Sequence, residues 1–202
     1  MHPGPALLGI VLVALVISGL TPADRATWIL EVSPVLIGVP LLVALWRRAP
    51  PSRLLAWLLA AHALILILGG HYTYAMVPPG FWVQDALGLA RNHYDRLGHL
   101  AQGFVPAILA REVLLRCSVL ERGGWMFLLV TCVVLAFSAF YELLEWWTAL
   151  VAGSAATAFL GTQGDVWDTQ WDMFLALIGA ASALLVLSRA HDRQLARLLS
   201  GR

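Results

Sequence analysis

Six stretches of mainly apolar residues follow one another along this chain, with short polar links between them. Their approximate bounds are residues 5–20, 28–46, 54–70, 95–115, 125–147 and 168–188. A helix needs about 20 mainly apolar residues to cross the hydrocarbon core of a bilayer. The pattern therefore predicts an all-α, polytopic membrane protein. We expect a bundle of about six transmembrane helices that forms a single transmembrane domain over residues 1–202.

The composition supports this interpretation. Hydrophobic residues make up 60% of the 202 residues and charged residues only 12%, whereas roughly a quarter of the residues in an average soluble domain are charged. A soluble domain of this size does not need so much apolar surface. Membrane lipids are therefore the expected partners and nucleic acid is not; the composition leaves the oligomeric state open.

The distribution of arginine predicts the orientation, because the chain contains no lysine. Most of the 13 basic residues lie in the link after the second span, in the link after the fourth, or beyond the sixth. Only Arg25, Arg91 and Arg96 lie on the other side. Links rich in arginine stay in the cytoplasm, so we expect both termini to be cytoplasmic.

The acidic residues show the opposite bias. Only Glu112, Glu121 and Asp192 fall on the predicted cytoplasmic side. Acidic residues contribute little to orientation, and charges at the edge of the hydrocarbon are costly. A functional site on the extracytoplasmic face is the better explanation for the bias.

The fourth predicted span begins with a polar stripe. Asp95 and His99 are four residues apart and share a helical face, and Gln102 follows three residues later. An aspartate one turn from a histidine can orient the imidazole, whether the histidine is a base or a metal ligand. The simpler alternative is a pair of interfacial polar residues bonded to their neighbours.

The fifth predicted span ends with two carboxylates, Glu142 and Glu145, which are three residues apart and lie on one side of the helix. One such glutamate could pair with Arg96. Two that face the same way indicate a shared cation or a shared proton.

The sixth predicted span begins with three aspartates. Asp165 is a reasonable N-cap, and the helix dipole favours Asp168 in the first turn. Asp172 lies one turn deeper, where the dipole explains it less well. Asp172 is therefore the strongest functional candidate of the three.

These three polar ends lie on the same predicted face of the membrane. A group of carboxylates with one histidine suits a divalent ion such as Mg²⁺, Mn²⁺ or Ca²⁺, and also Zn²⁺. The predicted metal ligands are Glu142, Glu145, Asp168, Asp172 and His99. The predicted catalytic residues are His99, Asp95, Glu142 and Asp172. The predicted substrate-binding residues are Arg96, Gln102, Tyr72 and Gln170.

The remaining polar residues have simpler explanations. His62 is predicted to be a core histidine bonded across helices, and His191 is predicted to lie on the surface. Arg111, Glu112 and Arg116 predict a salt-bridged helix end, since Glu112 and Arg116 are four residues apart.

Two of the predicted external links are long. The second half of residues 71–94 predicts an amphipathic helix that lies in the membrane interface. Residues 148–164 are small and weakly polar, which favours a re-entrant segment packed against the bundle.

The polar segments carry a family resemblance. Asn-His-Tyr-Asp-Arg-Leu-Gly-His at residues 92–99, Gln-Gly-Phe-Val-Pro-Ala at 102–107, Tyr-Glu at 141–142 and Gly-Asp-Val-Trp-Asp-Thr-Gln-Trp-Asp-Met at 164–173 resemble the YjdF-type family of bacterial inner-membrane proteins. The resemblance covers essentially the whole chain. It implies a multi-pass protein of the bacterial inner (plasma) membrane and supplies no reaction, because the family is named for a domain of unknown function.

A more distant likeness is to VanZ-like membrane proteins. The order is similar: a helix with Asp95 and His99, a helix with Glu142, and a helix with paired aspartates, Asp168 and Asp172. The chain departs from that pattern where Glu145 replaces a more common glutamine, and residues 173–178 lack an expected asparagine. This likeness implies a role that faces the cell envelope.

Three functions fit these observations. The first is a metal-assisted, membrane-embedded enzyme that acts on a lipid-linked or envelope substrate. The second is a non-catalytic protein that binds a headgroup or helps assembly. The third is a proton-coupled transporter, which is disfavoured because no matching set of inner acids and no inverted repeat are visible. The sequence does not decide whether the protein is an enzyme.

Overall fold

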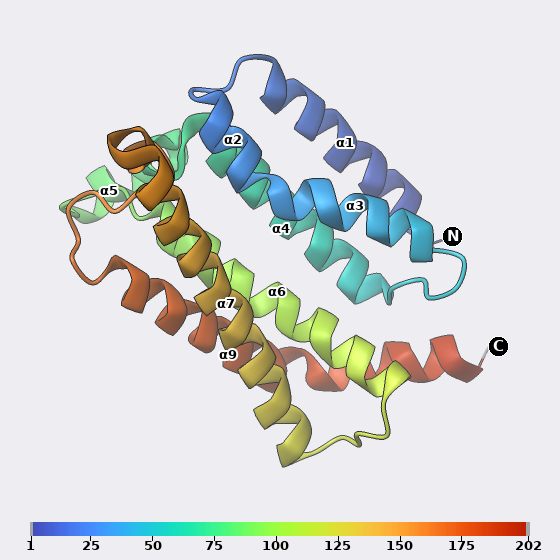
Figure 1. Ribbon diagram of the computed structural model, residues 1–202. Helices are drawn as coiled ribbons and strands as arrows, with labels where there is room; N and C mark the ends of the chain where they lie inside the picture. The colour runs from blue at the N-terminus through green and yellow to red at the C-terminus, as the bar shows by residue number, and fades with distance from the viewer. Residues whose placement is uncertain (1, 201–202) are drawn as a thin grey trace.

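The computed structural model describes residues 2–200, apart from the side chains of residues 154–155, 157–158 and 199–200, and this part of the chain consists of helices and loops without strands (Figure 1). The α-helices are α1 (Gly4–Leu20), α2 (Arg25–Glu31), α3 (Ser33–Leu45), α4 (Arg53–Tyr72), α5 (Pro78–Leu87), α6 (Tyr94–Cys117), α7 (Gly124–Ala152), α8 (Thr157–Leu160) and α9 (Asp168–Ser200). Short 3-10 helices cover Tyr74–Met76 and Gly153–Ala156. The predicted all-α class is confirmed.

Three helices are long and apolar enough to cross a membrane, namely α4, α7 and α9. The consecutive helices α2 and α3 would provide a fourth crossing if they form one bent span. The apolar helix α1 has only 17 residues, and α6 has 24 residues but carries charged residues near both ends. Six crossings therefore stay a prediction, which requires α1 and α6 to cross as well.

The second predicted span is broken rather than continuous. Helices α2 and α3 meet at Val32 with a bend of 45°. The break has a physical cause in Pro34, since proline has no backbone N–H to donate and disfavours helical geometry in the residue before it. As a result Glu31 is the last residue of a helix instead of an interior one.

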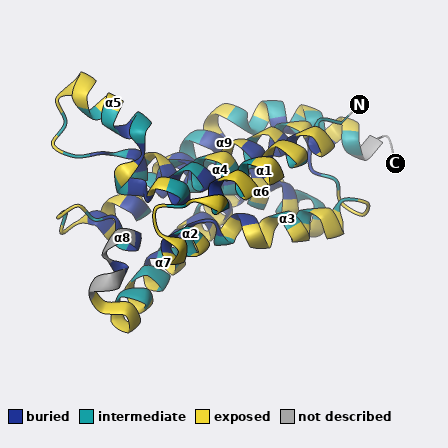
Figure 2. Cartoon of the chain, turned by 90° about the horizontal axis from the view of Figure 1, so that it is seen from above, coloured by how far each residue is buried: buried dark blue, intermediate teal, exposed yellow. Residues whose placement is uncertain are grey.

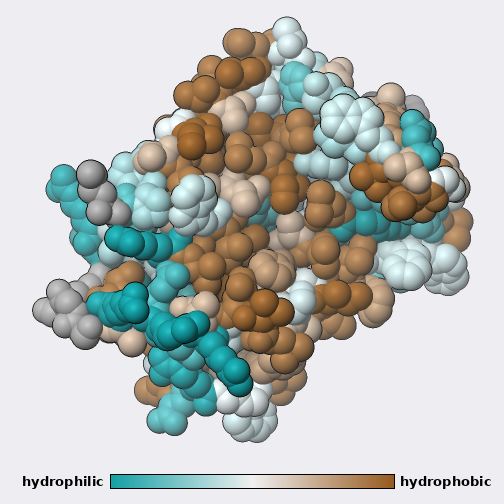
Figure 3. Space-filling model, turned by 180° about the vertical axis from the view of Figure 1, so that it is seen from behind, coloured by the Kyte–Doolittle hydropathy of each residue, from teal (hydrophilic) through white to brown (hydrophobic). Residues whose placement is uncertain are grey.

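Both chain ends lie at the same end of the bundle (Figure 1). We call this the termini end and the opposite end the far end. Large apolar side chains such as Ile17, Phe137 and Leu185 are exposed on the outer faces, and hydrophobic residues cover the middle of the rear face (Figure 3). Apolar surface this extensive is typical of contact with lipid. The cytoplasmic location of the termini stays a prediction.

The tightest packing joins α6 to α9 along most of their length. A Cβ atom on Gly103 would lie 1.9 Å from the carbonyl oxygen of Ala176, and a Cβ atom on Gly179 would lie 2.2 Å from that of Leu100. The two backbones are therefore in contact, as is common where small residues line the interface of membrane helices. This contact fixes the side chains of α6 against those of α9.

The Gly103→Ala substitution should lower the free energy of unfolding by about 3 kcal/mol, because the new methyl group would push α9 away from α6. The matched control is Gly9→Ala on α1, where an added Cβ meets no atom within 4 Å. The control should be neutral or stabilising by up to about 1 kcal/mol, since alanine favours the helix. Unfolding temperatures of both variants in detergent would test this, and equal temperatures would contradict the packing argument.

A buried ionic network closes the termini end of the α6–α9 contact. The Glu112 carboxylate accepts bonds from Arg116 Nη2 and His191 Nε2, each at 2.9 Å, and from the Ser52 backbone N–H at 3.0 Å. Arg111 donates to His191 Nδ1 at 2.9 Å, so the proton of this imidazole lies on Nε2. The predicted pair of Glu112 and Arg116 is present, but it belongs to a larger network that ties α4, α6 and α9 together.

The prediction that His191 lies on the surface is wrong, because its side chain is fully buried. Helix α9 continues to Ser200, well beyond the predicted end of the span at residue 188. Leu184, His191 and Leu195 follow one another at helical spacing on its buried face. The predicted hydrogen bond of His62 across helices is not found, since its buried Nε2 has no partner among residues 2–200.

Two predicted link segments are helical. Helix α5 projects from the far end of the bundle with Trp82 and Leu87 exposed (Figure 2). After α7, the chain folds back through Gly153–Ala156 and α8, which packs against α2 and α7. Phe159 is buried there, with its ring centroid 6.4 Å from that of Tyr141. The segment that favoured a re-entrant interpretation therefore covers the bundle beside α7.

Candidate functional site

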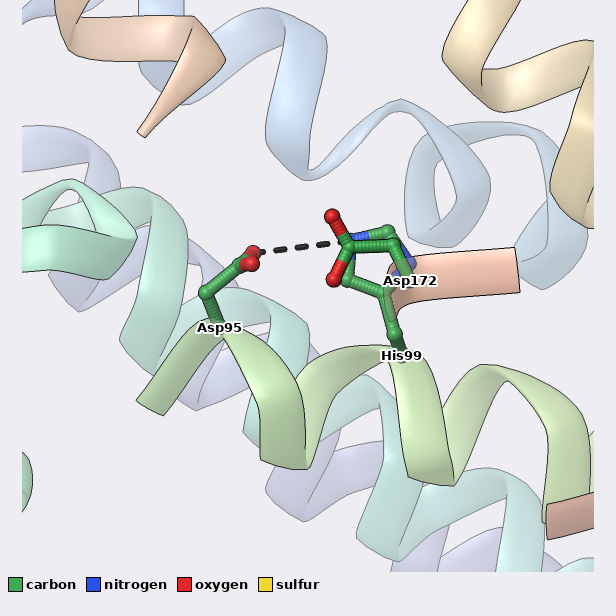
Figure 4. A group of neighbouring side chains, drawn as sticks. All are labelled: Asp95, His99 and Asp172. Carbon is green, nitrogen blue, oxygen red and sulfur yellow. Dashed lines mark ion pairs between the residues drawn. The ribbon is translucent and has the colours of Figure 1, made fainter. Parts of the chain in front are cut away.

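Three side chains from α6 and α9 meet toward the far end of their contact. His99 Nε2 lies 3.5 Å from Asp95 Oδ1, one turn earlier on α6, and 3.8 Å from Asp172 Oδ2 on α9. Figure 4 shows the Asp95 carboxylate pointing toward the His99 ring, with Asp172 beside that ring. His99 and Asp172 are buried and Asp95 is half-buried. Two carboxylates thus face the same ring nitrogen.

The other ring nitrogen of His99 faces α7. Its Nδ1 lies 4.0 Å from Glu142 Oε1. Ligand atoms of His99, Glu142 and Glu145 all lie within 4.8 Å of one another, and the same is true of Asp95, His99 and Asp172. His99 therefore belongs to two groups that could hold a metal ion, one on each side of its ring.

Hydrogen bonding distinguishes these two groups. Within the part of the chain that the structure describes, His99 Nδ1 and both carboxylate oxygens of Glu142 are buried without a well-formed hydrogen bond, although the Thr169 side chain lies near enough to interact with the Glu142 carboxylate. On the other side, the second oxygen of Asp172 accepts a bond from Arg96 Nη1. Buried polar atoms are nearly always satisfied, so the unpartnered atoms on the Glu142 side need an explanation that the other group does not require.

Two arginines bind the aspartates that begin α9. Arg91 Nη2 lies 3.1 Å from both Asp165 Oδ2 and Asp168 Oδ1, and Arg96 Nη2 lies 2.9 Å from the same two atoms. Asp168 is buried by this contact and belongs to neither of the two groups that could hold a metal. The residue predicted as a metal ligand is thus engaged by guanidinium groups.

Asp165 is not the N-cap of the last helix, because α9 begins at Asp168. Its Oδ1 instead accepts the backbone N–H of Trp167 at 2.9 Å and closes a turn in the preceding loop. That hydrogen bond, followed by the positive charges of Arg91 and Arg96, holds the pKa of the Asp165 carboxyl below its usual value of 3.8. Asp165 is therefore an anion at neutral pH.

The structure adds a further carboxylate that the sequence patterns did not single out. Glu31 is buried at the end of α2, and its Oε2 accepts a bond from the Tyr141 hydroxyl at 3.3 Å. An ionisable residue inside an otherwise apolar span indicates function on its own, so the signal was present. Arg91 was also missed. It is one of the few arginines outside the links that predict the cytoplasmic side, and an ion pair with a nearby acid would explain its position.

Three of the predicted substrate-binding residues make no hydrogen bond or ion pair with this cluster among the described residues. Tyr72 is exposed and stacks edge-on against His71, with ring centroids 4.7 Å apart. Gln170 is exposed and Gln102 half-buried, and neither has a hydrogen bond to the site within residues 2–200. Of the predicted set, only Arg96 contacts the clustered acids.

Comparisons with known proteins bear on identity but not on chemistry. The model of a family described as "Predicted membrane protein (DUF2238)" matches residues 5–193. The chain is 54% identical over 183 residues to "Inner membrane protein YjdF" of Escherichia coli (strain K12). The aligned region covers 91% of this chain and 88% of that protein. No solved structure matches significantly. The resemblance that the polar segments carry is confirmed, and so is the expected class of inner-membrane protein: the chain belongs to the DUF2238 family of membrane proteins.

Proposed function

We propose that this protein binds a divalent metal ion at the far end of the bundle and uses it in a metal-assisted reaction on a lipid-linked or envelope substrate. The observation that carries the proposal is the set of buried, unpartnered ligand atoms: His99 Nδ1 and the two oxygens of Glu142. A divalent cation would satisfy all three at once, with Glu145 completing the group. We place this centre on the extracytoplasmic face, as the arginine distribution predicts.

The donor set fits such an ion. One imidazole nitrogen with carboxylate oxygens suits Mn²⁺ or Zn²⁺ better than an ion that takes oxygen ligands alone, such as Mg²⁺ or Ca²⁺. An ion on the Nδ1 side would leave the Nε2 proton of His99 directed at Asp95 and Asp172. Histidines that bind metals almost always donate their other N–H in this way, which fixes the ring orientation.

The roles of the side chains follow from this assignment. Asp95 and Asp172 are positioning residues that hold the His99 ring through Nε2. Arg96 holds Asp172 in turn. Glu31 lies outside the ligand group and hydrogen-bonds Tyr141, which makes it a candidate to accept or donate a proton. A bound divalent ion supplies polarisation of a phosphoryl or carbonyl oxygen and activation of water.

Binding of Mn²⁺ to purified, chelator-treated protein tests the proposal. We expect saturable binding of one ion for each chain. At a free concentration of about 100 times the Kd, the ion should raise the free energy of unfolding by about 2.7 kcal/mol. The proposed metal centre would be overturned if the protein showed no saturable binding of either Mn²⁺ or Zn²⁺ at micromolar concentration.

The enzymatic part needs a separate measurement. Release of a soluble headgroup from lipid in mixed micelles should require the ion and should be lost in Asp172→Ala. A metal-loaded protein that turns over no lipid-linked or envelope substrate would contradict catalysis. It would favour instead the alternative of a non-catalytic protein that binds a headgroup or helps assembly.

A further inference from the structure

The guanidinium groups of Arg91 and Arg96 converge on one point. Their Nη2 atoms lie 3.1 and 2.9 Å from the same oxygen of Asp165. Arg91 comes from the loop before α6 and Arg96 from its first turn, so the two groups reach this point from different backbone positions. Two convergent guanidinium groups form an arrangement that recognises oxyanions, in particular phosphate.

Both arginines are held in place by partners other than Asp165. Arg91 donates to the carbonyl oxygen of Thr162, and Arg96 donates to the carboxylate of Asp172 and at 3.3 Å to the Asp168 carbonyl. Asp168 Oδ1 also binds both guanidinium groups. The arginines would therefore keep their positions if the Asp165 carboxylate moved away.

Asp165 is the aspartate of this cluster whose carboxylate a ligand can displace most easily. Its side chain is 25% exposed, compared with 8% for Asp168 and 3% for Asp172. It is also the only one of these three aspartates in a loop. Gln163 and Gly164, just before it, have positive φ angles of 48° and 84°, and a Cβ on Gly164 would meet no atom within 4 Å. Asp165 is therefore the carboxylate of the three that a ligand from solution reaches first, in a loop that has free space at Gly164.

We propose that Arg91 and Arg96 form a binding site for the phosphate group of a phosphate ester, and that the Asp165 carboxylate occupies this site until the ligand displaces it. This inference deepens the proposed function by naming a substrate class, and it rests on that function for the reaction but not for the binding. Arg96 connects the site to the candidate metal ligands, because it binds Asp172, whose other oxygen lies 3.8 Å from His99 Nε2.

The charges favour a phosphate over a carboxylate ligand. Asp165 already supplies a carboxylate at the high effective concentration of an intramolecular group, so a free carboxylate would compete poorly. A phosphate monoester carries up to two negative charges and more acceptor oxygens, so it can take both bonds that Asp165 Oδ2 gives up, one from each guanidinium group.

The surroundings favour a lipid as the source of the phosphate. Val166 and Trp167, next to Asp165, are exposed, and tryptophan is enriched at the level of the lipid headgroups. Lipid phosphates would therefore lie at the depth of Asp165. The shared chemistry is the phosphate ester, and the experiment separates a headgroup from free phosphate.

The test is titration calorimetry on the full chain in a detergent without phosphate, with dihexanoyl phosphatidic acid and inorganic phosphate as probes. Asp165→Asn should bind the lipid about tenfold more tightly than wild type, because it removes the competing charge from two charge-assisted bonds. Asparagine keeps an oxygen that can accept the Trp167 N–H, so the loop turn is preserved. Arg91→Gln should weaken binding about tenfold or more.

Asp85→Asn is the matched control, since Asp85 is an exposed aspartate on α5, and it should leave the affinity unchanged. An increase in affinity cannot come from loss of folding, so Asp165→Asn keeps the test decisive even if Arg91→Gln unfolds. Unchanged or weaker binding in Asp165→Asn would overturn the proposal, as would the absence of binding of both probes to that variant.

The two probes also identify the source. Binding of the lipid alone would assign the site to a lipid headgroup. Equal binding of inorganic phosphate would support the phosphate site and exclude the lipid as its specific ligand. Glu142→Gln should abolish Mn²⁺ binding and leave phosphate binding intact. The phosphate site and the metal centre can therefore fail independently.

Discussion

Glu142→Gln should lose Mn²⁺ binding and yet unfold at a higher temperature than wild type when no metal is present. Among the described residues, both carboxylate oxygens of Glu142 are buried without a well-formed hydrogen bond, and the His99 ring nitrogen lies 4.0 Å from Oε1. A buried charge that is so poorly compensated costs several kcal/mol. The neutral amide removes that charge at nearly the same volume. It also removes a ligand, so the Kd for Mn²⁺ should rise about 100-fold or more.

Thermal unfolding with and without Mn²⁺ measures both effects in one experiment. Wild type should gain stability from the ion, whereas the variant should start higher and gain nothing. Asp85→Asn, which changes an exposed aspartate on α5, should behave like wild type under both conditions. A variant that is less stable than wild type without metal would mean that Glu142 has a structural partner instead of a ligand role.

Glu112→Ala should lower the free energy of unfolding by about 3–5 kcal/mol, the usual effect of removing one partner from a buried ion pair. Its carboxylate is the common acceptor for Arg116, His191 and the Ser52 backbone N–H. Alanine would leave His191 Nε2 and the Ser52 N–H buried without this acceptor, while Arg116 would keep only its bonds to the Pro50 carbonyl. Because the network ties α4, α6 and α9 together, the loss should affect the whole bundle.

Arg122→Gln is the control for this experiment, because the Arg122 side chain is 55% exposed and pairs only at the surface with Asp192. An exposed pair contributes at most about 1 kcal/mol. Unfolding temperatures of the two variants in the same detergent give the comparison. Equal temperatures would show that the Glu112 network adds little to stability.

Hydropathy predicted the apolar helices well because their length and composition are set by the bilayer. Hydropathy could not locate the break at Val32, because two prolines of the same span behave differently. The helix is interrupted just before Pro34, whereas Pro40 lies inside α3 without ending it. Hydropathy also ended the last span too early, because His191 and its charged neighbours lower the mean hydropathy of a helix that continues to Ser200. The repeat of Leu184, His191 and Leu195 on one face was the signal for this extension.

Local spacing predicted local contacts and missed the distant ones. Asp95 and His99 meet because they are four residues apart on one helix. Arg91 binds Asp165 and Asp168 across more than seventy residues, and no pattern within a single segment encodes such a pairing. The same limitation hid the extent of the network around Glu112, because its bonds to His191 and Ser52 join residues that are distant in the sequence.

The glycine contact between α6 and α9 has an electrical consequence. Ionisable groups lie at each end of this helix pair, and a file of water between them would let protons pass from one end of the bundle to the other. The two backbones touch at Gly103 and Gly179, and Ala176 and Ala180 beside them are fully buried. A water molecule needs a cavity with polar partners, which this seam does not leave. The seam between α6 and α9 therefore offers no path along which water could carry protons from one set of ionisable groups to the other.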